Sequence, residues 1–269
     1  MQFRRVVVCL LVIGSVLVLG GCASSEEWGW YVVSPWTKQG RINIAFLLSG
    51  VGWTVLLTIC CVVLSTVLGF LLYLPRVANN RWLNGLNRTI VELFRSIPPL
   101  VSLLWVYYGL PVLTGVDLDP FFSGVAALSL YGAAFMAEIF RGGVQSIERG
   151  QFEAADSLAL STTDKMIYVI LPQALRRSLP AMGNQFVILL KMSSLVSVIG
   201  LSEVVRRANE LSVTEYRPLE IYTFLVLEYL VLVLALSAGV RWVERKLGAD
   251  ERTVRDRKST RLNSSHLVI

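Results

Sequence analysis

Charged residues are scarce in this sequence: Asp, Glu, Lys and Arg make up only 16% of its 269 residues, whereas 54% are hydrophobic. A soluble domain of this length carries more charge, so the composition excludes that class and indicates an integral membrane protein. The sequence also lacks the Gly-x-x-x-x-Gly-Lys-Ser/Thr loop that binds nucleotide phosphates. We therefore expect that this chain does not itself bind ATP.

Histidine and cysteine are also rare. The one histidine and the four cysteines show no spacing typical of a zinc site or a disulfide, so we expect no metal ion and no cofactor. Cys60 and Cys61 lie in the middle of an apolar run, where thiols pack as small hydrophobic groups. The net charge of +6 is not gathered into a basic patch interleaved with aromatic residues, so we expect no nucleic-acid partner.

Long apolar runs are what the chain has in abundance. A helix needs about 20 apolar residues to cross the hydrocarbon core of a bilayer, because lipid cannot satisfy backbone hydrogen bonds. Cations follow the second, fourth and sixth runs and mark the cytoplasmic side. The loop 148–180 is therefore expected inside and residues 24–41 outside. The six runs are 6–19, 46–74, 90–113, 121–139, 186–205 and 221–240.

The N-terminus has the features of an export signal: a basic start, a short apolar run and small residues before Cys22. The tetrad Leu19-Gly20-Gly21-Cys22 resembles the lipobox of bacterial lipoproteins, which implies lipidation of Cys22 after cleavage. An uncleaved signal anchor fits equally well. Residues 1–22 are thus a signal peptide or a lipoprotein signal/anchor. Residues 23–45 form a periplasmic aromatic segment, which either lies at the periplasmic surface of the membrane that the chain spans or acts as a lid.

The C-terminal residues 248–269 form a polar tail. Within it, residues 256–269 resemble the conceptual translation of a sequencing adapter and include the only histidine, His266. Such residues carry no information on fold or function, so they are excluded from both predictions.

The loop 148–180 contains the pattern of two short helices. Strong helix formers fill residues 151–160, with Phe152, Ala155, Leu158 and Ala159 on one stripe. Ser161 is an N-cap with Asp164 three residues later, which predicts a second helix over 162–170. Proline predicts its end at Leu171-Pro172. Two short helices at an angle form a knob that fits a groove on a soluble partner; the alternative is an amphipathic loop on the membrane surface.

This loop resembles the EAA loop of the membrane subunits of ABC importers. Glu153, Ala154 and Ala155 match the motif that gives the loop its name, and Leu171 with Pro172 matches its Leu-Pro. Ala159 stands where that family usually has glycine. A glycine there permits a tight turn, whereas alanine takes a positive φ only at a cost. The resemblance implies that these six residues couple the chain to an ATPase.

The resemblance extends over about 50–247. In its details, the sequence resembles the polar amino-acid uptake subfamily. It is carried by "VELFRSIPPLVSLLWVYYGLP" (91–111), "AEIFRGGVQSI" (137–147) and the stretch 171–203, although Ser96, Ile97 and Met192 depart from the usual pattern. It implies an all-α membrane protein: a type I ABC importer transmembrane domain (46–247) with five core helices, preceded by the N-terminal signal/anchor segment.

The function implied by this resemblance is that of the permease subunit of an ATP-driven amino-acid importer in the bacterial cytoplasmic (inner) membrane. The chain forms half of the translocation pathway and performs no covalent chemistry, so it is not an enzyme. The implied partners are an ATP-binding cassette subunit, a periplasmic solute-binding protein and a second permease copy or sister permease. Two alternatives are a membrane-anchored lipoprotein scaffold and a proton-coupled secondary transporter, although the broken inverted repeats of the latter are absent from the sequence.

Charged residues within spans are candidates for the pathway, because an isolated charge in hydrocarbon costs several kcal/mol. Glu228 lies centrally in the last run and is a candidate for the ammonium group of a substrate. It equally fits a hydrogen bond to the helices that carry Tyr107, Tyr108 or Tyr131. Further candidates, for the substrate carboxylate, are Lys191, Ser193 and Ser194.

Overall fold

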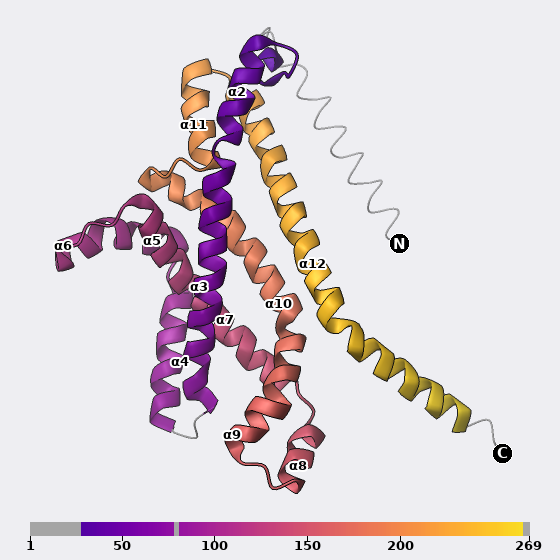
Figure 1. Ribbon diagram of the computed structural model, residues 1–269. Helices are drawn as coiled ribbons and strands as arrows, with labels where there is room; N and C mark the ends of the chain where they lie inside the picture. Colours follow the sequence, from indigo (N-terminus) through magenta and orange to yellow (C-terminus); the bar gives the residue numbers. More distant parts are fainter. Residues whose placement is uncertain (1–27, 78–80, 266–269) are drawn as a thin grey trace, which may run out of the picture.

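The computed structural model describes residues 28–77 and 81–265, and it describes side chains for residues 28–76 and 81–246 (Figure 1). All regular structure in these residues is helical, as predicted. The predicted signal segment 1–22, its candidate lipidation site Cys22 and the last four residues lie outside the described residues. The helices are α2 (Lys38–Leu48), α3 (Val51–Val77), α4 (Arg81–Ser96), α5 (Pro99–Leu104), α6 (Leu110–Thr114), α7 (Pro120–Gln145), α8 (Arg149–Ser157), α9 (Thr162–Asp164), α10 (Leu171–Met192), α11 (Val204–Glu215) and α12 (Pro218–Ser265).

Four helical stretches are long and apolar enough to cross a membrane: Lys38–Arg76, Pro120–Gln145, Thr162–Ile199 and Pro218–Lys246. Three predicted runs, 46–74, 121–139 and 221–240, lie within these stretches and are confirmed. Figure 1 shows α2 and α11 at one end of the long helices and α8 and α9 at the other. The backbone of α12 continues to Ser265, beyond the predicted domain end at residue 247.

The predicted run 90–113 is not one straight span. It divides into α4 and the stretch Pro99–Thr114, which meet at an angle of 97°. The break lies at Pro98, whose ψ of 135° is extended rather than helical. A proline disfavours the helical conformation of the residue before it, so the pair Pro98-Pro99 forces the chain out of the helix. The prediction of a continuous helix was wrong because it considered apolar length alone.

The predicted run 186–205 also needs correction. The apolar helix begins much earlier, at Thr162, and α10 itself ends at Met192. A 3₁₀ segment, η5 (Ser193–Ile199), follows and stops at Gly200, whose φ is 96°. Residues 204 and 205 already belong to α11. A positive φ is readily adopted by glycine, and this residue therefore sets the end of the span.

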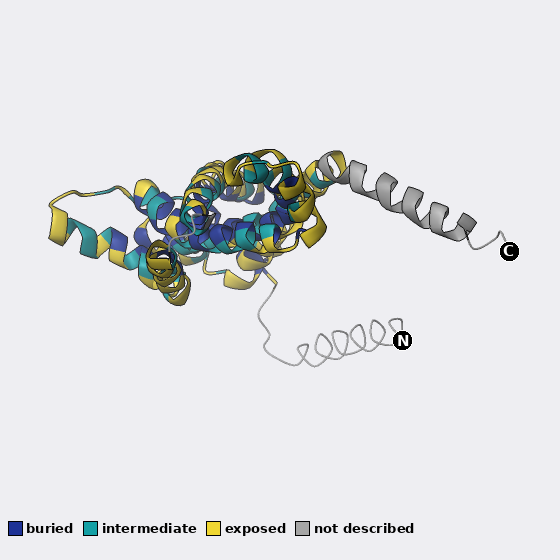
Figure 2. Cartoon of the chain, turned by 90° about the horizontal axis from the view of Figure 1, so that it is seen from below, coloured by how far each residue is buried: buried dark blue, intermediate teal, exposed yellow. Residues whose placement is uncertain are grey.

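The core lies where α7 packs between α3 and α10. Seen from below, the buried residues lie toward the middle of the bundle (Figure 2). Close approach of α3 and α7 depends on Gly69, because a Cβ atom there would lie 2.3 Å from Cβ of Met136. Small residues at such contacts let membrane helices approach closely, which compensates for the weak hydrophobic drive between helices in lipid. The apolar residues Met136, Ala133 and Ala137 of α7 are consequently fully buried.

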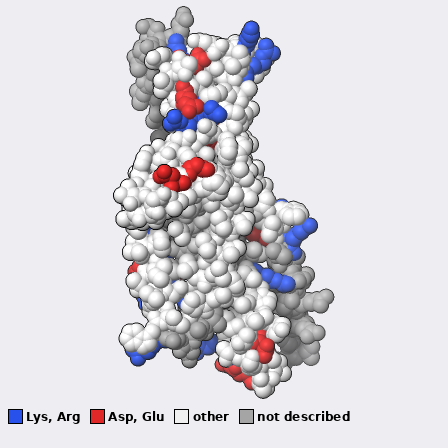
Figure 3. Space-filling model, turned by 60° about the vertical axis from the view of Figure 1, so that its left-hand side comes forward, with Lys and Arg blue, Asp and Glu red and all other residues white. Residues whose placement is uncertain are grey.

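At the end of the long helices that carries α11, a small cap joins the first described residues to the first turn of α12. The 3₁₀ segment η2 (Trp30–Val33) lies in the predicted aromatic segment, and its Val32 is fully buried. The backbone N–H of Gly29 donates to Oε1 of Glu220 at 2.6 Å, 191 residues away. Trp28 and Trp36 stay exposed. Figure 3 shows a wide uncharged stretch in the middle of the face drawn, as expected of a surface that meets lipid.

Candidate coupling loop and substrate pathway

The predicted knob is present and is built from the short helix α8, a turn and the start of a much longer helix. α8 replaces the predicted helix 151–160 and ends three residues earlier, at Ser157. Ser161 caps the next helix as predicted: its Oγ accepts from the N–H of Asp164 and donates to the Asp164 carboxylate at 2.6 Å. The knob has its own small core, in which Ile147, Ile170 and Ala174 are buried. It is therefore a folded unit rather than a flat amphipathic loop.

The second helix of the knob does not end at Leu171-Pro172, contrary to the prediction. α9, the π-helical segment η4 (Lys165–Ile170), α10 and η5 form one helical stretch, Thr162–Ile199, of 38 residues. Pro172 falls in the first turn of α10, directly after the wider π-helical turn. We attribute the tolerance of a proline at this position to the π-helical turn. The wider turn leaves room for the proline ring, which has no N–H to donate within the helix. Leu171 is half-buried and Pro172 is exposed.

The matched residues of α8 separate into a buried and an exposed set. Ala155 is 2% exposed, whereas Glu153 and Ala154 are exposed. The predicted apolar stripe is thus only partly correct, since Leu158 is 74% exposed and Ala159 is also exposed. The Glu153 side chain forms no ion pair or hydrogen bond within the described part of the chain. An exposed leucine and an unused carboxylate together give the knob a surface suited to a partner.

Ala159 adopts the conformation for which glycine is suited. Its φ is 52°, in the left-handed region, and Tyr216 is the other non-glycine residue with a positive φ among the described residues. Its N–H donates to the carbonyl of Asp156 at 2.9 Å, which closes the turn after α8. A side chain in this region costs roughly 1–2 kcal/mol through contact of Cβ with the carbonyl oxygen. The turn geometry expected of a glycine is therefore kept despite the alanine.

Three of the four pathway candidates, Ser193, Ser194 and Glu228, lie on η5 and α12. These two elements meet where Tyr229 of α12 interacts with Ser193 and Ser194. Glu228 is 7% exposed, and neither of its carboxylate oxygens has a hydrogen-bond partner among the described residues. The alternative of a hydrogen bond to Tyr107, Tyr108 or Tyr131 is therefore not observed. Ser193 and Ser194 donate to the backbone carbonyls of Leu190 and Lys191.

Lys191 is the exception among these candidates, because its side chain is exposed and it forms no ion pair with Glu228. It lies in the last turn of α10, where a cation interacts favourably with the helix dipole.

Two residues of this cluster were not predicted from the sequence. Glu203 is fully buried at the N-terminus of α11, where its Oε1 accepts from the N–H of Arg206 at 2.8 Å. Burial raises its pKa to about 7, against the opposing effect of the backbone N–H groups of Val205 and Arg206. Tyr229 of α12 donates to Oε2 of Glu203 at 3.4 Å and also interacts with Ser193 and Ser194. The sequence signal was weak, because an acidic residue before a helix is a common cap.

Comparison with known proteins places the chain in a transport family. The family model described as "Binding-protein-dependent transport system inner membrane component" matches residues 65–249. The chain is 36% identical over 205 residues to a "Probable glutamine ABC transporter permease protein GlnM" of Bacillus subtilis, covering 76% of this chain and 94% of the relative. It is 35% identical over 222 residues to the "Glutamine transport system permease protein GlnP" of Escherichia coli K12, covering 82% and 98%.

Solved structures show the same fold. The crystal structure of an amino acid ABC transporter with histidines is 34% identical and superposes with a TM-score of 0.72, covering 77% of this chain and 96% of that chain. The MetNI methionine ABC transporter gives a TM-score of 0.67 at 21% identity, covering 77% and 98%. The architecture is thus that of a type I ABC importer transmembrane domain. Together with the family match, these similarities show that the chain belongs to the family of inner membrane components of binding-protein-dependent transport systems.

Proposed function

We propose that this chain is the permease subunit of an ATP-driven amino-acid importer and that ATP is bound and hydrolysed on a separate subunit. The observation that carries the proposal is the knob 148–180, which is packed on its own core and presents an exposed leucine and an unpaired Glu153. The similarity to glutamine permeases supports an amino acid as substrate. The comparisons give no support to a lipoprotein scaffold or to a proton-coupled secondary transporter.

The continuous helix after the knob supports a mechanical route for coupling. Ser161 begins it and η5 ends it, so one rigid element joins the knob to Ser193 and Ser194. A helix rises about 1.5 Å per residue, so a stretch of 38 residues is roughly 57 Å long, more than the hydrocarbon core of about 30 Å requires. Closure of two ATPase subunits would move the knob, and this helix would transmit the displacement to the pathway. Glu153, Ala154, Ala155, Ala159, Leu171 and Pro172 form or support the coupling surface.

The pathway is proposed to pass the cluster that contains Glu228, Ser193 and Ser194. A buried carboxylate without a hydrogen bond is costly, so its presence calls for a cationic partner such as a substrate ammonium group. Lys191 remains a candidate for the substrate carboxylate, at the exposed end of α10. Glu203 and Tyr229 hold the neighbouring backbone of α11 and α12 in place.

The orientation and partners follow from the same proposal. The basic connections place the knob in the cytoplasm and the α11 cap outside the bacterial inner membrane. A solute-binding protein would deliver substrate to the connections near Asp117 and Asp119 and to residues 206–217. A second copy or a sister permease would complete the pore, and α12, whose apolar stretch is only 6% buried, offers surface for it and for lipid. Lipidation at Cys22 remains part of the proposal.

Charge reversal at Glu153 tests the proposal in the reconstituted transporter. Glu153→Lys is expected to abolish most ATP-driven uptake while the protein still inserts and binds lipid normally. Glu148→Lys is the matched control, because this exposed residue precedes α8 without capping it through its side chain. Unchanged uptake in Glu153→Lys would favour a scaffold. Uptake driven by a pH gradient without ATP would instead identify a secondary transporter.

A further inference from the structure

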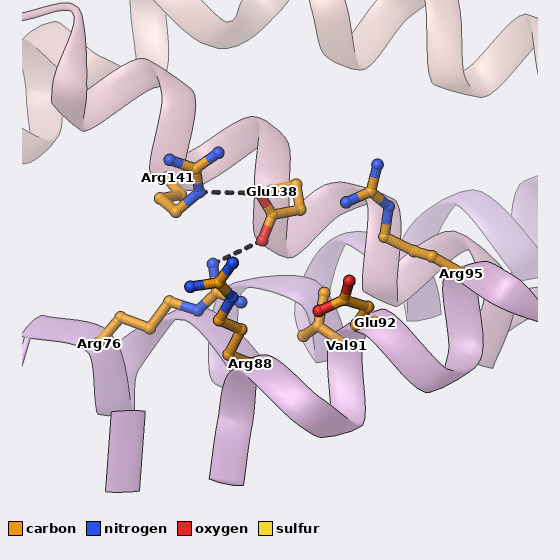
Figure 4. A pocket seen from close by; sticks show the side chains of 7 residues that line it. All are labelled: Arg76, Arg88, Val91, Glu92, Arg95, Glu138 and Arg141. Carbon is orange, nitrogen blue, oxygen red and sulfur yellow. Dashed lines mark hydrogen bonds and ion pairs between the residues drawn. The ribbon is translucent and has the colours of Figure 1, made fainter. Parts of the chain in front are cut away.

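A pocket of about 340 Å³ lies between α4 and the ends of α3 and α7 nearest the knob (Figure 4). Four guanidinium groups and two carboxylates line it, which leaves two positive charges in excess. A second hollow of about 350 Å³ shares three of these arginines. We name the first the arginine pocket; its lining residues are Arg76, Arg88, Val91, Glu92, Arg95, Glu138 and Arg141.

Glu138 is already satisfied within the pocket. Its Oε1 lies 2.6 Å from Nη1 of Arg76, and its Oε2 lies 2.7 Å from Nε of Arg141, so each oxygen has a cationic partner. Figure 4 shows this carboxylate between the two arginines. Nη2 of Arg76 is buried and has no acceptor among the described residues. A buried guanidinium donor without an acceptor is unfavourable, which indicates that the pocket is completed by an anion.

The orientation of α4 shows which environment the pocket opens to. Arg88, Glu92 and Arg95 recur at intervals of four and three residues, so they share one face of the helix. All three are exposed, and no ion pair joins them among the described residues. The opposite face carries the exposed apolar residues Leu86 and Leu93. Because charged groups avoid hydrocarbon, the apolar face meets lipid and the charged face meets an aqueous route.

We propose that the arginine pocket binds the carboxylate groups of the transported amino acid on the knob side of the pathway, and that it favours an acidic amino acid over a basic one. This inference rests on the proposed transport function and adds a substrate class to it. A guanidinium matches a carboxylate with two parallel hydrogen bonds. The excess of positive charge attracts a second carboxylate and repels a cationic side chain.

The geometry gives the individual side chains distinct roles. The guanidinium carbon of Arg95 lies 5.0 Å from the ring centroid of Phe135, which fixes its plane and leaves its N–H groups for a ligand. Arg88 adds an exposed cation on the same face. Glu92 is placed to accept the α-ammonium group that every amino acid carries. Glu228 lies nearer the α11 end, so the two sites act at different depths of the pathway.

Direct binding to the purified permease with its ATPase partner, in lipid nanodiscs and without a solute-binding protein, tests this proposal. Radiolabelled L-glutamate is expected to bind more tightly than L-glutamine, and L-arginine most weakly. Arg95→Gln and Arg88→Gln are each expected to weaken L-glutamate binding about tenfold, the usual effect of losing a hydrogen bond to a charged group. Arg95→Lys keeps the charge and should recover part of the loss. Arg81→Gln, on the same helix but outside the pocket, should bind like the unaltered chain.

Three results would overturn the proposal. The first is L-arginine binding as tightly as L-glutamate, and the second is unaltered L-glutamate binding in both Gln variants with normal basal ATP hydrolysis. The third is L-glutamate binding that appears only in nanodiscs without phosphatidylglycerol, because lipid headgroups would then be the natural occupant. ATP-driven uptake distinguishes the two proposals. If the transporter moves amino acids but fails these binding tests, only the proposal on the arginine pocket is wrong. If it moves no amino acid, the proposed transport function is wrong as well.

Discussion

Asp156 and Lys165 form an ion pair of 2.5 Å between Oδ1 and Nζ, across the turn that joins α8 to the long helix. The Lys165 side chain is 17% exposed, so its stem is packed while its ammonium group reaches the carboxylate. Gln173 reinforces the same junction by donating to Oε1 of Gln151 at 3.0 Å. The two helices of the knob are therefore held at a fixed angle before any partner binds, which favours transmission of motion over local rearrangement.

Loss of this ion pair should loosen the knob without unfolding the protein. Asp156→Asn is expected to cost about 0.5 kcal/mol, the usual value for a partly exposed pair, and to speed amide exchange at residues 157–164. A double-mutant cycle with Lys165→Met, measured by thermal unfolding in detergent, should give a coupling energy of similar size. Additive effects of the two substitutions would show that the pair contributes nothing to the knob.

Ala159→Gly should stabilise the knob. The backbone at this position has a φ of 52°, and removal of Cβ relieves roughly 1 kcal/mol of strain, partly offset by the greater freedom of glycine in the unfolded chain. Slower hydrogen exchange at residues 157–164 is the expected signature. Ala154→Gly is the matched control: this residue lies inside α8, where glycine costs about 1 kcal/mol. Equal destabilisation by both substitutions would contradict the strain at Ala159.

Features that depend on short stretches of sequence were predictable. Apolar length located three spans, because a membrane helix satisfies its own backbone hydrogen bonds and needs no knowledge of its neighbours. Ser161 with Asp164 identified the start of the second helix, since a cap acts within one turn. The motif Glu153-Ala154-Ala155 located the knob by resemblance.

Features that depend on contacts between distant segments were not predictable. Pro172 was expected to end a helix, but the π-helical turn before it accommodates the ring, and no residue pattern announced that turn. Glu203 was overlooked because it is buried by packing against α12, and this contact between distant segments forms only in the folded chain. The arginine pocket likewise combines residues of α3, α4 and α7, which are distant in the sequence and meet only in the folded chain.

Glu203 should make stability depend on pH. Its pKa is raised to about 7 by burial, whereas in the unfolded chain it is near 4.5. The folded state then binds more protons between these values, so its contribution is fully present below pH 4.5 and is lost as pH rises through 7. Thermal unfolding should show stability falling by up to about 1.4 kcal/mol per pH unit in that window. Glu203→Gln keeps an oxygen that accepts from the N–H of Arg206 and should flatten this profile; an unchanged slope would assign the effect to another group.

Gly69→Ala should destabilise the protein through the contact of α3 with α7. The added Cβ would lie 2.3 Å from Cβ of Met136 and 2.9 Å from the backbone oxygen of Ala133, and neither atom can move without shifting α7. Overpacking of this kind costs about 1–3 kcal/mol. Gly52→Ala is the control in the same helix, since nothing lies within 4 Å of its added Cβ and alanine is the better helix former. A lower melting temperature for Gly69→Ala and an unchanged or higher one for Gly52→Ala are expected. If both variants melt alike, α3 and α7 are not packed through Gly69, and the close approach that buries Met136 and Ala133 must have another cause.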